Sequence, residues 1–173
     1  MEKYVPDIYQ KSIYTIDYNK LKNRGIKCIL FDLDNTIVPS NIKEVTRKLK
    51  DLFDEIKEQS FHIIIFSNNN KKRLKPFKET LNVDCCSNAM KPFVKKYLMI
   101  LNEYNYKETE VAIIGDQLCT DILGGNKTGI TTILVNPISK KDFFGTKVNR
   151  LIEMVIMKKL RDKNLFVKGR YYE

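Results

Sequence analysis

The chain has 173 residues, of which 43% are hydrophobic and 30% are charged; this length suits one hydrophobic core rather than two catalytic domains, so we expect a single domain over residues 1–173. Because no apolar stretch approaches the roughly 18 residues that would cross a bilayer, and because Met1–Pro6 does not resemble a secretory signal, we expect a cytoplasmic protein. The net charge of +10 indicates an anionic partner, such as nucleic acid, an acidic lipid surface or a phosphorylated small molecule.

Four short apolar runs, rich in β-branched residues, predict the strands of a sheet. In chain order they are Lys27–Phe31, His62–Phe66, Val111–Ile114 and Thr131–Val135, with a shorter strand expected at about 83–86. Their apolar character is continuous rather than alternating, which is typical of parallel strands covered on both faces.

The stretches between these runs carry apolar residues at three- and four-residue spacing, which predicts helices. These helices are expected at 44–58, 70–80, 92–104 and 120–127, with a basic helix at about 148–160. The alternation predicts an α/β fold with a doubly wound, Rossmann-like, mainly parallel sheet and a catalytic core at about 25–137. Gly124–Gly129 lacks the spacing of a nucleotide-binding loop, so we interpret it as a helix end and turn.

The cysteines and the single histidine do not form a recognisable metal or catalytic site. The four cysteines contain no C-x-x-C pair, and adjacent Cys85 and Cys86 cannot readily bridge each other, so we expect all four to be reduced. His62 has apolar neighbours and is interpreted as a strand residue with a satisfied ring nitrogen. A Cys/His zinc site and a Ser-His-Asp or Cys-His mechanism are therefore disfavoured.

Polar residues follow the predicted strands, at the end of the sheet where ligands bind in folds of this kind. They are Asp32-Leu33-Asp34, Ser67-Asn68-Asn69, Lys91-Pro92 and Gly115-Asp116, with Asp121 five residues further on. Taken singly, Ser67 and Asp34 could be turn or helix caps and Lys91 a solvated surface residue. Together, in this order and at strand ends, they predict one site.

This order of motifs resembles the haloacid dehalogenase (HAD) superfamily of phosphohydrolases over about residues 28–137. The resemblance is carried by D-x-D-N-T, S-N-N, K-P and G-D-x-x-x-x-D. It implies that Asp32 attacks phosphorus to form an aspartyl-phosphate, and that Asp34 protonates the leaving group and then activates water. The second acid favours phosphate chemistry over dehalogenation.

By the same resemblance, Lys91 supplies a fixed positive charge, and Ser67 and Asn68 bind phosphate oxygens. Thr36 is a further candidate for a supporting hydrogen bond. The resemblance implies Mg²⁺ as the cofactor, held by the Asp32 carboxylate, the Asp34 backbone carbonyl and the Asp116 carboxylate. Asp121 would lie behind these ligands or bind through water.

The chain has no room for the inserted cap domain that encloses many HAD active sites. We therefore expect a capless, open site and a large or membrane-presented phosphorylated substrate: protein, nucleic acid or a lipid headgroup. The runs Phe31–Pro39, Gly115-Asp116-Gln117 and Thr120-Asp121-Ile122 resemble the capless subclass IIIA branch called the YqeG family. Relatives of that branch include phosphatidylglycerophosphate phosphatases, which implies a role in phospholipid biosynthesis.

Basic segments leave several partners open. Lys71, Lys72, Arg73, Lys75 and Lys78 fall in one helix, and the C-terminal segment at about 140–173 carries ten basic and four acidic residues. These segments could contact an anionic membrane peripherally, at its inner face. The helix at about 148–160 could instead pack on the sheet, and the aromatic and basic tail 166–172 could contact RNA.

Other function classes share some of these features. A receiver module also combines an α/β sheet, an acceptor aspartate and a lysine, but its acidic pair comes first and its acceptor later. A HAD scaffold that binds without catalysis is disfavoured because Asp32, Asp34, Lys91 and Asp116 are all present. Within enzymes, a phosphatase of nucleic acid, phosphoprotein or a soluble phosphometabolite remains the alternative.

Overall fold

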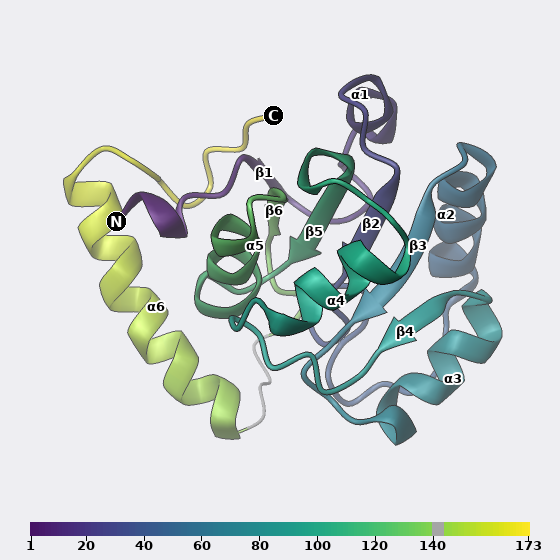
Figure 1. Ribbon diagram of the computed structural model, residues 1–173. Helices are drawn as coiled ribbons and strands as arrows, with labels where there is room; N and C mark the ends of the chain where they lie inside the picture. The colour runs from purple at the N-terminus through teal and green to yellow at the C-terminus, as the bar shows by residue number, and fades with distance from the viewer. Residues whose placement is uncertain (140–143) are drawn as a thin grey trace.

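The centre of the molecule is a six-stranded parallel sheet with the strand order β1-β6-β5-β2-β3-β4 (Figure 1). The structure is a computed structural model; it describes residues 1–139 and 144–173, without the side chains of 144–149. The strands are β1 (Ile8–Gln10), β2 (Cys28–Phe31), β3 (His62–Phe66), β4 (Asp84–Cys86), β5 (Val111–Gly115) and β6 (Thr131–Val135). The predicted α/β, Rossmann-like class is confirmed.

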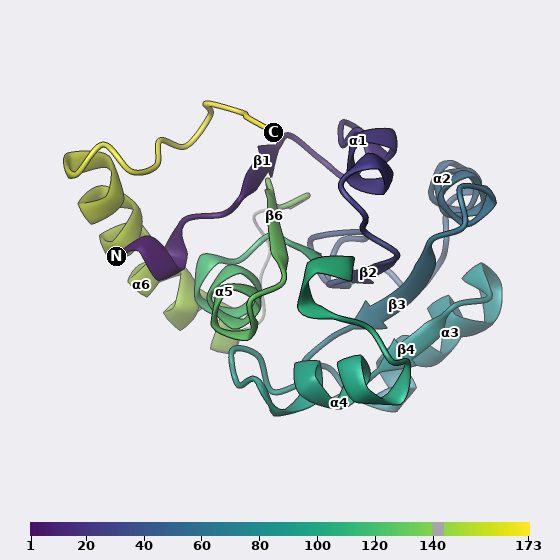
Figure 2. The same ribbon diagram turned by 45° about the horizontal axis from the view of Figure 1, so that its top comes forward.

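Helices cover both faces of this sheet (Figures 1 and 2). One face packs against α1 (Tyr18–Asn23), α2 (Arg47–Glu58) and α3 (Lys71–Leu81), and the other against α4 (Lys95–Glu103) and α5 (Leu123–Thr128). The long helix α6 (Phe144–Asp162) lies beside α5. Between the first acidic motif and Lys91, a stretch the structure describes completely, the only helices and strands are α2, β3, α3 and β4, so no cap domain is inserted there.

Alternate strand residues point to opposite faces, which divides the core into two layers. Phe31 packs against Phe53 of α2, with ring centroids 4.9 Å apart, whereas Phe66 packs against Tyr97 of α4 at 4.5 Å. Residues of β2, β3 and β5 are almost fully buried on both sides, as their continuous apolar sequences require. This double burial holds the strand ends, and the residues that follow them, in fixed positions.

Several boundaries differ from the sequence expectation. The helix expected at 44–58 begins at Arg47, because the Thr46 hydroxyl accepts a hydrogen bond from Leu49 N and caps it. The helix expected from Pro92 begins at Lys95, because residues 90–93 form a turn. The helix expected at 120–127 consists of a π-helical turn (Leu118–Ile122) followed by α5.

The sequence analysis missed the first strand and helix. Strand β1 has only three residues and α1 only six, so neither is long enough to show a reliable hydrophobic period. Short 3₁₀ turns at Glu2–Tyr4 and Glu108–Glu110 were also not expected. Strand β1 belongs to the sheet because it pairs with β6, far along the chain.

The C-terminal tail packs on the sheet edge formed by β1. Tyr9 and Tyr172 exchange two backbone hydrogen bonds of 2.9 Å, and the buried Phe166 ring lies 5.1 Å from the Tyr9 ring. This contact covers a strand edge that would otherwise be open.

The expected C-terminal segment begins at 140, and its residues 140–143 lie outside the described residues. The side chain of Val148, at the expected start of the basic helix, also lies outside them.

The cysteines and the histidine have the structural roles expected for them. All four cysteines are free thiols. His62 begins β3, and its two ring nitrogens lie 3.1 Å from the Tyr106 hydroxyl and 2.6 Å from an Asp84 carboxylate oxygen. Both nitrogens therefore have partners, at the end of the sheet opposite the acidic motifs.

Candidate active site

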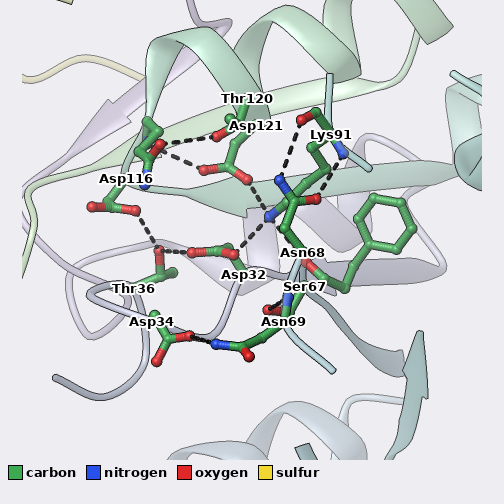
Figure 3. Close-up of polar contacts among 12 residues, drawn as sticks. Asp32, Asp34, Thr36, Ser67, Asn68, Asn69, Lys91, Asp116, Thr120 and Asp121 are labelled. Atoms are coloured by element: carbon green, nitrogen blue, oxygen red, sulfur yellow. Dashed lines mark hydrogen bonds and ion pairs between the residues drawn. The ribbon is translucent and has the colours of Figure 1, made fainter. Parts of the chain in front are cut away.

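The predicted site residues gather where the parallel strands end. Asp32 follows β2, Ser67 follows β3 and Asp116 follows β5, while Lys91 comes from the loop after β4 (Figure 3). Most of the polar residues buried in this part of the molecule belong to the site: Asp32, Asn35, Thr36, Ser67, Lys91, Asp116, Thr120 and Asp121. Burial of so many polar groups together is costly unless they pair with one another or with a ligand.

Three carboxylates form the centre of the site. Asp32, Asp116 and Asp121 each offer a carboxylate oxygen within 4.8 Å of the other two. The Thr36 hydroxyl lies between two of them, 3.1 Å from Asp32 Oδ2 and 3.3 Å from Asp116 Oδ1. Such a compact set of oxygen donors fits a hard divalent cation such as Mg²⁺.

Lys91 supplies positive charge from the side opposite Thr36. Its Nζ lies 2.6 Å from Asp32 Oδ1, 2.6 Å from Asp121 Oδ1 and 3.0 Å from the Phe66 carbonyl oxygen. Burial alone would lower the pKa of Lys91, but the carboxylates of Asp121 and Asp32 outweigh burial and raise it. The lysine is therefore a permanent cation with all three donor positions used.

The two remaining acids have unusually high proton affinity. Burial raises the pKa of Asp121 to about 6, with Asp32 acting in the same direction and Lys91 opposing it. Burial also raises the pKa of Asp116 well above its usual range, where nearby Asp32 and Asp121 add to the effect and Arg150 opposes it. Burial and neighbouring carboxylates thus disfavour the charged forms of both acids, and a nearby cation would favour them.

Gly115 allows Asp121 to lie against the end of β5. A Cβ atom at this position would come within 2.1 Å of the Asp121 Cγ atom, closer than any real contact allows. The side chain of the fourth motif therefore requires glycine at the strand end.

Asp34 lies apart from the three central carboxylates (Figure 3). Its Oδ1 accepts hydrogen bonds from Arg73 Nη2 at 2.7 Å and Nε at 3.1 Å, and its Oδ2 accepts one from Asn69 Nδ2 at 3.0 Å. Arg73 also donates to the Ile42 and Pro39 carbonyl oxygens. The structure thus places Asp34 at the rim of the site, held by α3.

The second-motif residues contact the backbone around the site. The Ser67 hydroxyl accepts a hydrogen bond of 3.1 Å from Asn69 N. Asn68 accepts one of 2.7 Å from Lys91 N and donates one of 3.2 Å to Lys91 O. Asn68 therefore positions the Lys91 loop, a contact that the sequence analysis did not anticipate.

Helix α6 contributes two residues that the sequence analysis did not select. The Arg150 guanidinium binds the Asp116 carboxylate, and its Nη1 lies 3.1 Å from both Asp116 O and Glu153 Oε2. Buried Glu153 accepts a further hydrogen bond from Cys119 N. The sequence signal that could have indicated their role is an Arg and a Glu three residues apart on a helix. Such pairs usually lie on the protein surface, so the spacing did not single them out.

Sequence comparison places the chain among phosphatases. The profile of the family described as "Mitochondrial PGP phosphatase" matches residues 1–139. The chain is 40% identical to the Bacillus subtilis protein named "Probable phosphatase YqeG" over 92% of this chain and 93% of that protein. It is 25% identical to the Arabidopsis thaliana "Phosphatidylglycerophosphate phosphatase 1, chloroplastic/mitochondrial", covering 93% of this chain but only 49% of that protein.

Solved structures show the same fold. The 3-deoxy-D-manno-octulosonate 8-phosphate phosphatase of Yersinia pestis superposes with a TM-score of 0.52 at 15% identity, over 68% of this chain and 69% of that one. The cobalt-bound octulosonate 8-phosphate phosphatase YrbI of Haemophilus influenzae gives 0.51 at 13% identity, over 80% and 94%. A Legionella pneumophila hydrolase assigned to HAD subfamily III A gives 0.52 at 15%, over 69% and 71%. With these relatives, the chain belongs to the YqeG family of phosphatases, and it shares its fold with the HAD subfamily III A hydrolase.

Proposed function

We propose that this phosphatase hydrolyses phosphomonoesters through an aspartyl-phosphate on Asp32, with Mg²⁺ as cofactor, within one domain that spans residues 1–173. The observation that carries the proposal is the position of Asp32, which lies between the Lys91 ammonium group on one side and the Thr36 hydroxyl and Asp116 carboxylate on the other. One of its carboxylate oxygens contacts Lys91, and the other faces Thr36 and Asp116. This arrangement fixes the orientation of a nucleophile.

In the proposed first step, an Asp32 oxygen attacks phosphorus and the bond to the leaving oxygen breaks. Asp34, at the partly exposed rim of the site, donates a proton to that leaving oxygen. In the second step, Asp34 takes a proton from water as the water attacks phosphorus, which releases inorganic phosphate and restores Asp32. Lys91 and Ser67 stabilise the phosphate oxygens in both steps, while Asn68 holds the Lys91 backbone in place.

Asp32, Asp116 and the Asp34 backbone carbonyl would hold the Mg²⁺ ion. Asp121 would not bind the ion directly but would contact it through water or support its ligands. When bound, the ion would offset the charge of the phosphate. The fit rests on an all-oxygen donor set within 4.8 Å. The raised pKa of Asp116 and Asp121 supports it, because burial disfavours their charged forms and a bound cation would favour them.

We further propose that the substrate is phosphatidylglycerophosphate, presented at the inner face of a membrane to a cytoplasmic enzyme. The names of the matching family and of the Arabidopsis relative support this substrate, as do the open site and the net charge of +10. No described helix has the length and apolar character needed to cross a bilayer.

The first experiment compares the wild type with Asp32→Asn in an assay of Mg²⁺-dependent phosphate release. We expect the variant to lose about 10⁴-fold or more of the activity, because an amide cannot act as the nucleophile. Full activity in that variant would contradict the assigned nucleophile. Its folded state is checked by circular dichroism, since removal of one of the carboxylates around Lys91 can also change stability.

A substrate panel then tests the lipid. Phosphatidylglycerophosphate in mixed micelles, phosphorylated oligonucleotides, phosphopeptides and soluble phosphomonoesters are ranked by kcat/KM. The lipid should rank first. Preference for an oligonucleotide, a phosphopeptide or a soluble ester would transfer the assignment to that class.

A further inference from the structure

Exposed apolar side chains lie on segments that hold or adjoin the active-site residues. Eight large apolar residues that are more than one third exposed lie in loops after the carboxyl ends of strands or in the middle of α6. We call them the apolar rim: Ile42, Met90, Phe93, Ile138, Leu151, Ile152, Met154 and Val155. Exposed apolar groups that cluster in this way usually mark an interaction surface.

Hydrogen bonds tie the loop members of the rim to the site itself. The Ile42 carbonyl oxygen accepts from Arg73, which holds Asp34. Met90 and Phe93 flank Lys91 in sequence and close one turn, with Phe93 N 2.9 Å from Met90 O. Ile138 N donates to Asn35 O at 2.9 Å. The three loops therefore adjoin the residues of the site.

Helix α6 adds the largest part of the rim. Glu153, Ile156 and Leu160 are buried against the body of the protein, whereas Leu151 and Met154, on the other side of the helix, are each 70% exposed. The contact of Arg150 with Asp116 brings this part of α6 to the site. In Figure 1 the helix begins at the lower side of the molecule, toward which the arrowheads of β3 and β5 point.

Basic residues accompany the rim. Exposed lysines and arginines occupy the loop before α2 and the first turns of α2, α3 and α4, and lie one turn beyond the exposed apolar residues of α6. They are Lys43, Arg47, Lys48, Lys71, Lys72, Lys95, Lys158 and Lys159. Apolar groups accompanied by cations on the same segments match the surface of an acidic bilayer, which is anionic at the headgroups and apolar beneath them.

We propose that the apolar rim docks the protein on the surface of an anionic bilayer, with the active-site mouth facing the lipid headgroups. This inference deepens the proposed function, on which it rests, because it names the surface that meets the lipid. The rim side chains would enter the boundary between headgroups and acyl chains while the basic residues pair with lipid phosphates. A headgroup phosphate could then reach Asp32 without leaving the membrane.

Vesicle flotation tests the proposal with a matched pair of double variants. Leu151→Ser/Met154→Ser removes two rim residues, and Leu98→Ser/Met99→Ser removes two α4 residues that are each 43% exposed outside the rim. We expect the rim variant to bind vesicles containing phosphatidylglycerol about tenfold or more weakly than the wild type, and the control variant to bind unchanged. Hydrolysis of soluble p-nitrophenyl phosphate should be equal in all three proteins.

Phe93→Ser provides a second rim variant on a different element and should also weaken vesicle binding. Equal binding of the wild type and both rim variants would overturn the proposal, as would a wild type that does not bind anionic vesicles. A dimer in solution that only the rim variants dissociate would assign the rim to self-association instead. If vesicle binding depends on the rim but no lipid phosphate is hydrolysed, the docking surface stands and the proposed substrate fails.

Discussion

Acidic residues at the two ends of the parallel strands have pKa values shifted in opposite directions. At the amino end, partly exposed Glu110 has a lowered pKa, because it accepts a backbone hydrogen bond from Lys107 and a side-chain hydrogen bond from Lys27. At the carboxyl end, burial raises the pKa of Asp116 and Asp121. Charges at the amino end are solvated and locally paired, whereas those at the carboxyl end are buried and crowded, with Lys91 and Arg150 as the cations that contact the three acids.

This difference indicates how much the ionisable groups at each end of the sheet contribute to stability and to function. Water and salt screen the ion pairs of the amino end, so each contributes little to folding. The buried groups of the carboxyl end depend on one another, so removal of one leaves its partners uncompensated. Substitutions at the two ends should therefore differ greatly in their effects.

The largest difference is expected between Lys91→Met and Lys27→Met. Lys91→Met leaves Asp32 and Asp121 buried without their cation, which should lower the free energy of unfolding by about 3–5 kcal/mol and phosphatase activity by about 10³-fold or more. Lys27 is 63% exposed and pairs with Glu110 at 2.6 Å, so its substitution should leave activity unchanged. Denaturant titration and steady-state kinetics measure both quantities; similar losses in the two variants would contradict the comparison.

A smaller effect concerns Mg²⁺ binding and pH. Because the pKa of Asp121 is raised to about 6 and that of Asp116 also lies above its usual range, both hold protons more readily than ordinary acids as pH falls. The ion must displace these protons, so we expect Mg²⁺ affinity to fall below about pH 6, by up to about tenfold per pH unit for each proton displaced.

Calorimetry at several pH values, in buffers with different ionisation enthalpies, measures both the affinity and the protons released. Affinity that stays constant from pH 7 to about 5, with no proton release, would contradict the raised pKa values of these two acids. Glu110 provides the contrast, since its lowered pKa keeps it ionised throughout this range.

The smallest effect is expected from Arg73→Met, which removes the two-nitrogen contact with Asp34. We expect kcat on a soluble phosphomonoester to fall about tenfold with little change in KM, because Arg73 orients the acid without touching phosphate. Arg73→Lys should restore only part of kcat, since an ammonium cannot reproduce the fork. The neighbouring Lys72→Met is the control, and a rise in KM at constant kcat would instead indicate that Arg73 binds substrate.

The sequence by itself determined the sheet class and most of the residues that meet at the site. Continuous apolar runs rich in β-branched residues indicated strands covered on both faces, and this placed Asp32, Ser67 and Asp116 at strand ends that share one side of the sheet. Element boundaries moved by a few residues where a cap or turn decided the start, as at Thr46 and at residues 90–93. Hydrophobic period does not report such local hydrogen bonds.

Only the tertiary structure decided which cations hold the acids and where the apolar rim lies. Arg73 reaches Asp34 across 39 residues, Arg150 reaches Asp116 across 34, and the tail pairs with β1 across almost the whole chain. Sequence periodicity relates residues only within a few turns of each other. From periodicity alone, these arginines are therefore interpreted as surface charges and the rim residues as scattered apolar residues. Arg73 and Arg150 contact the site, and the rim residues come together, only because the parallel sheet directs all its carboxyl ends to one side.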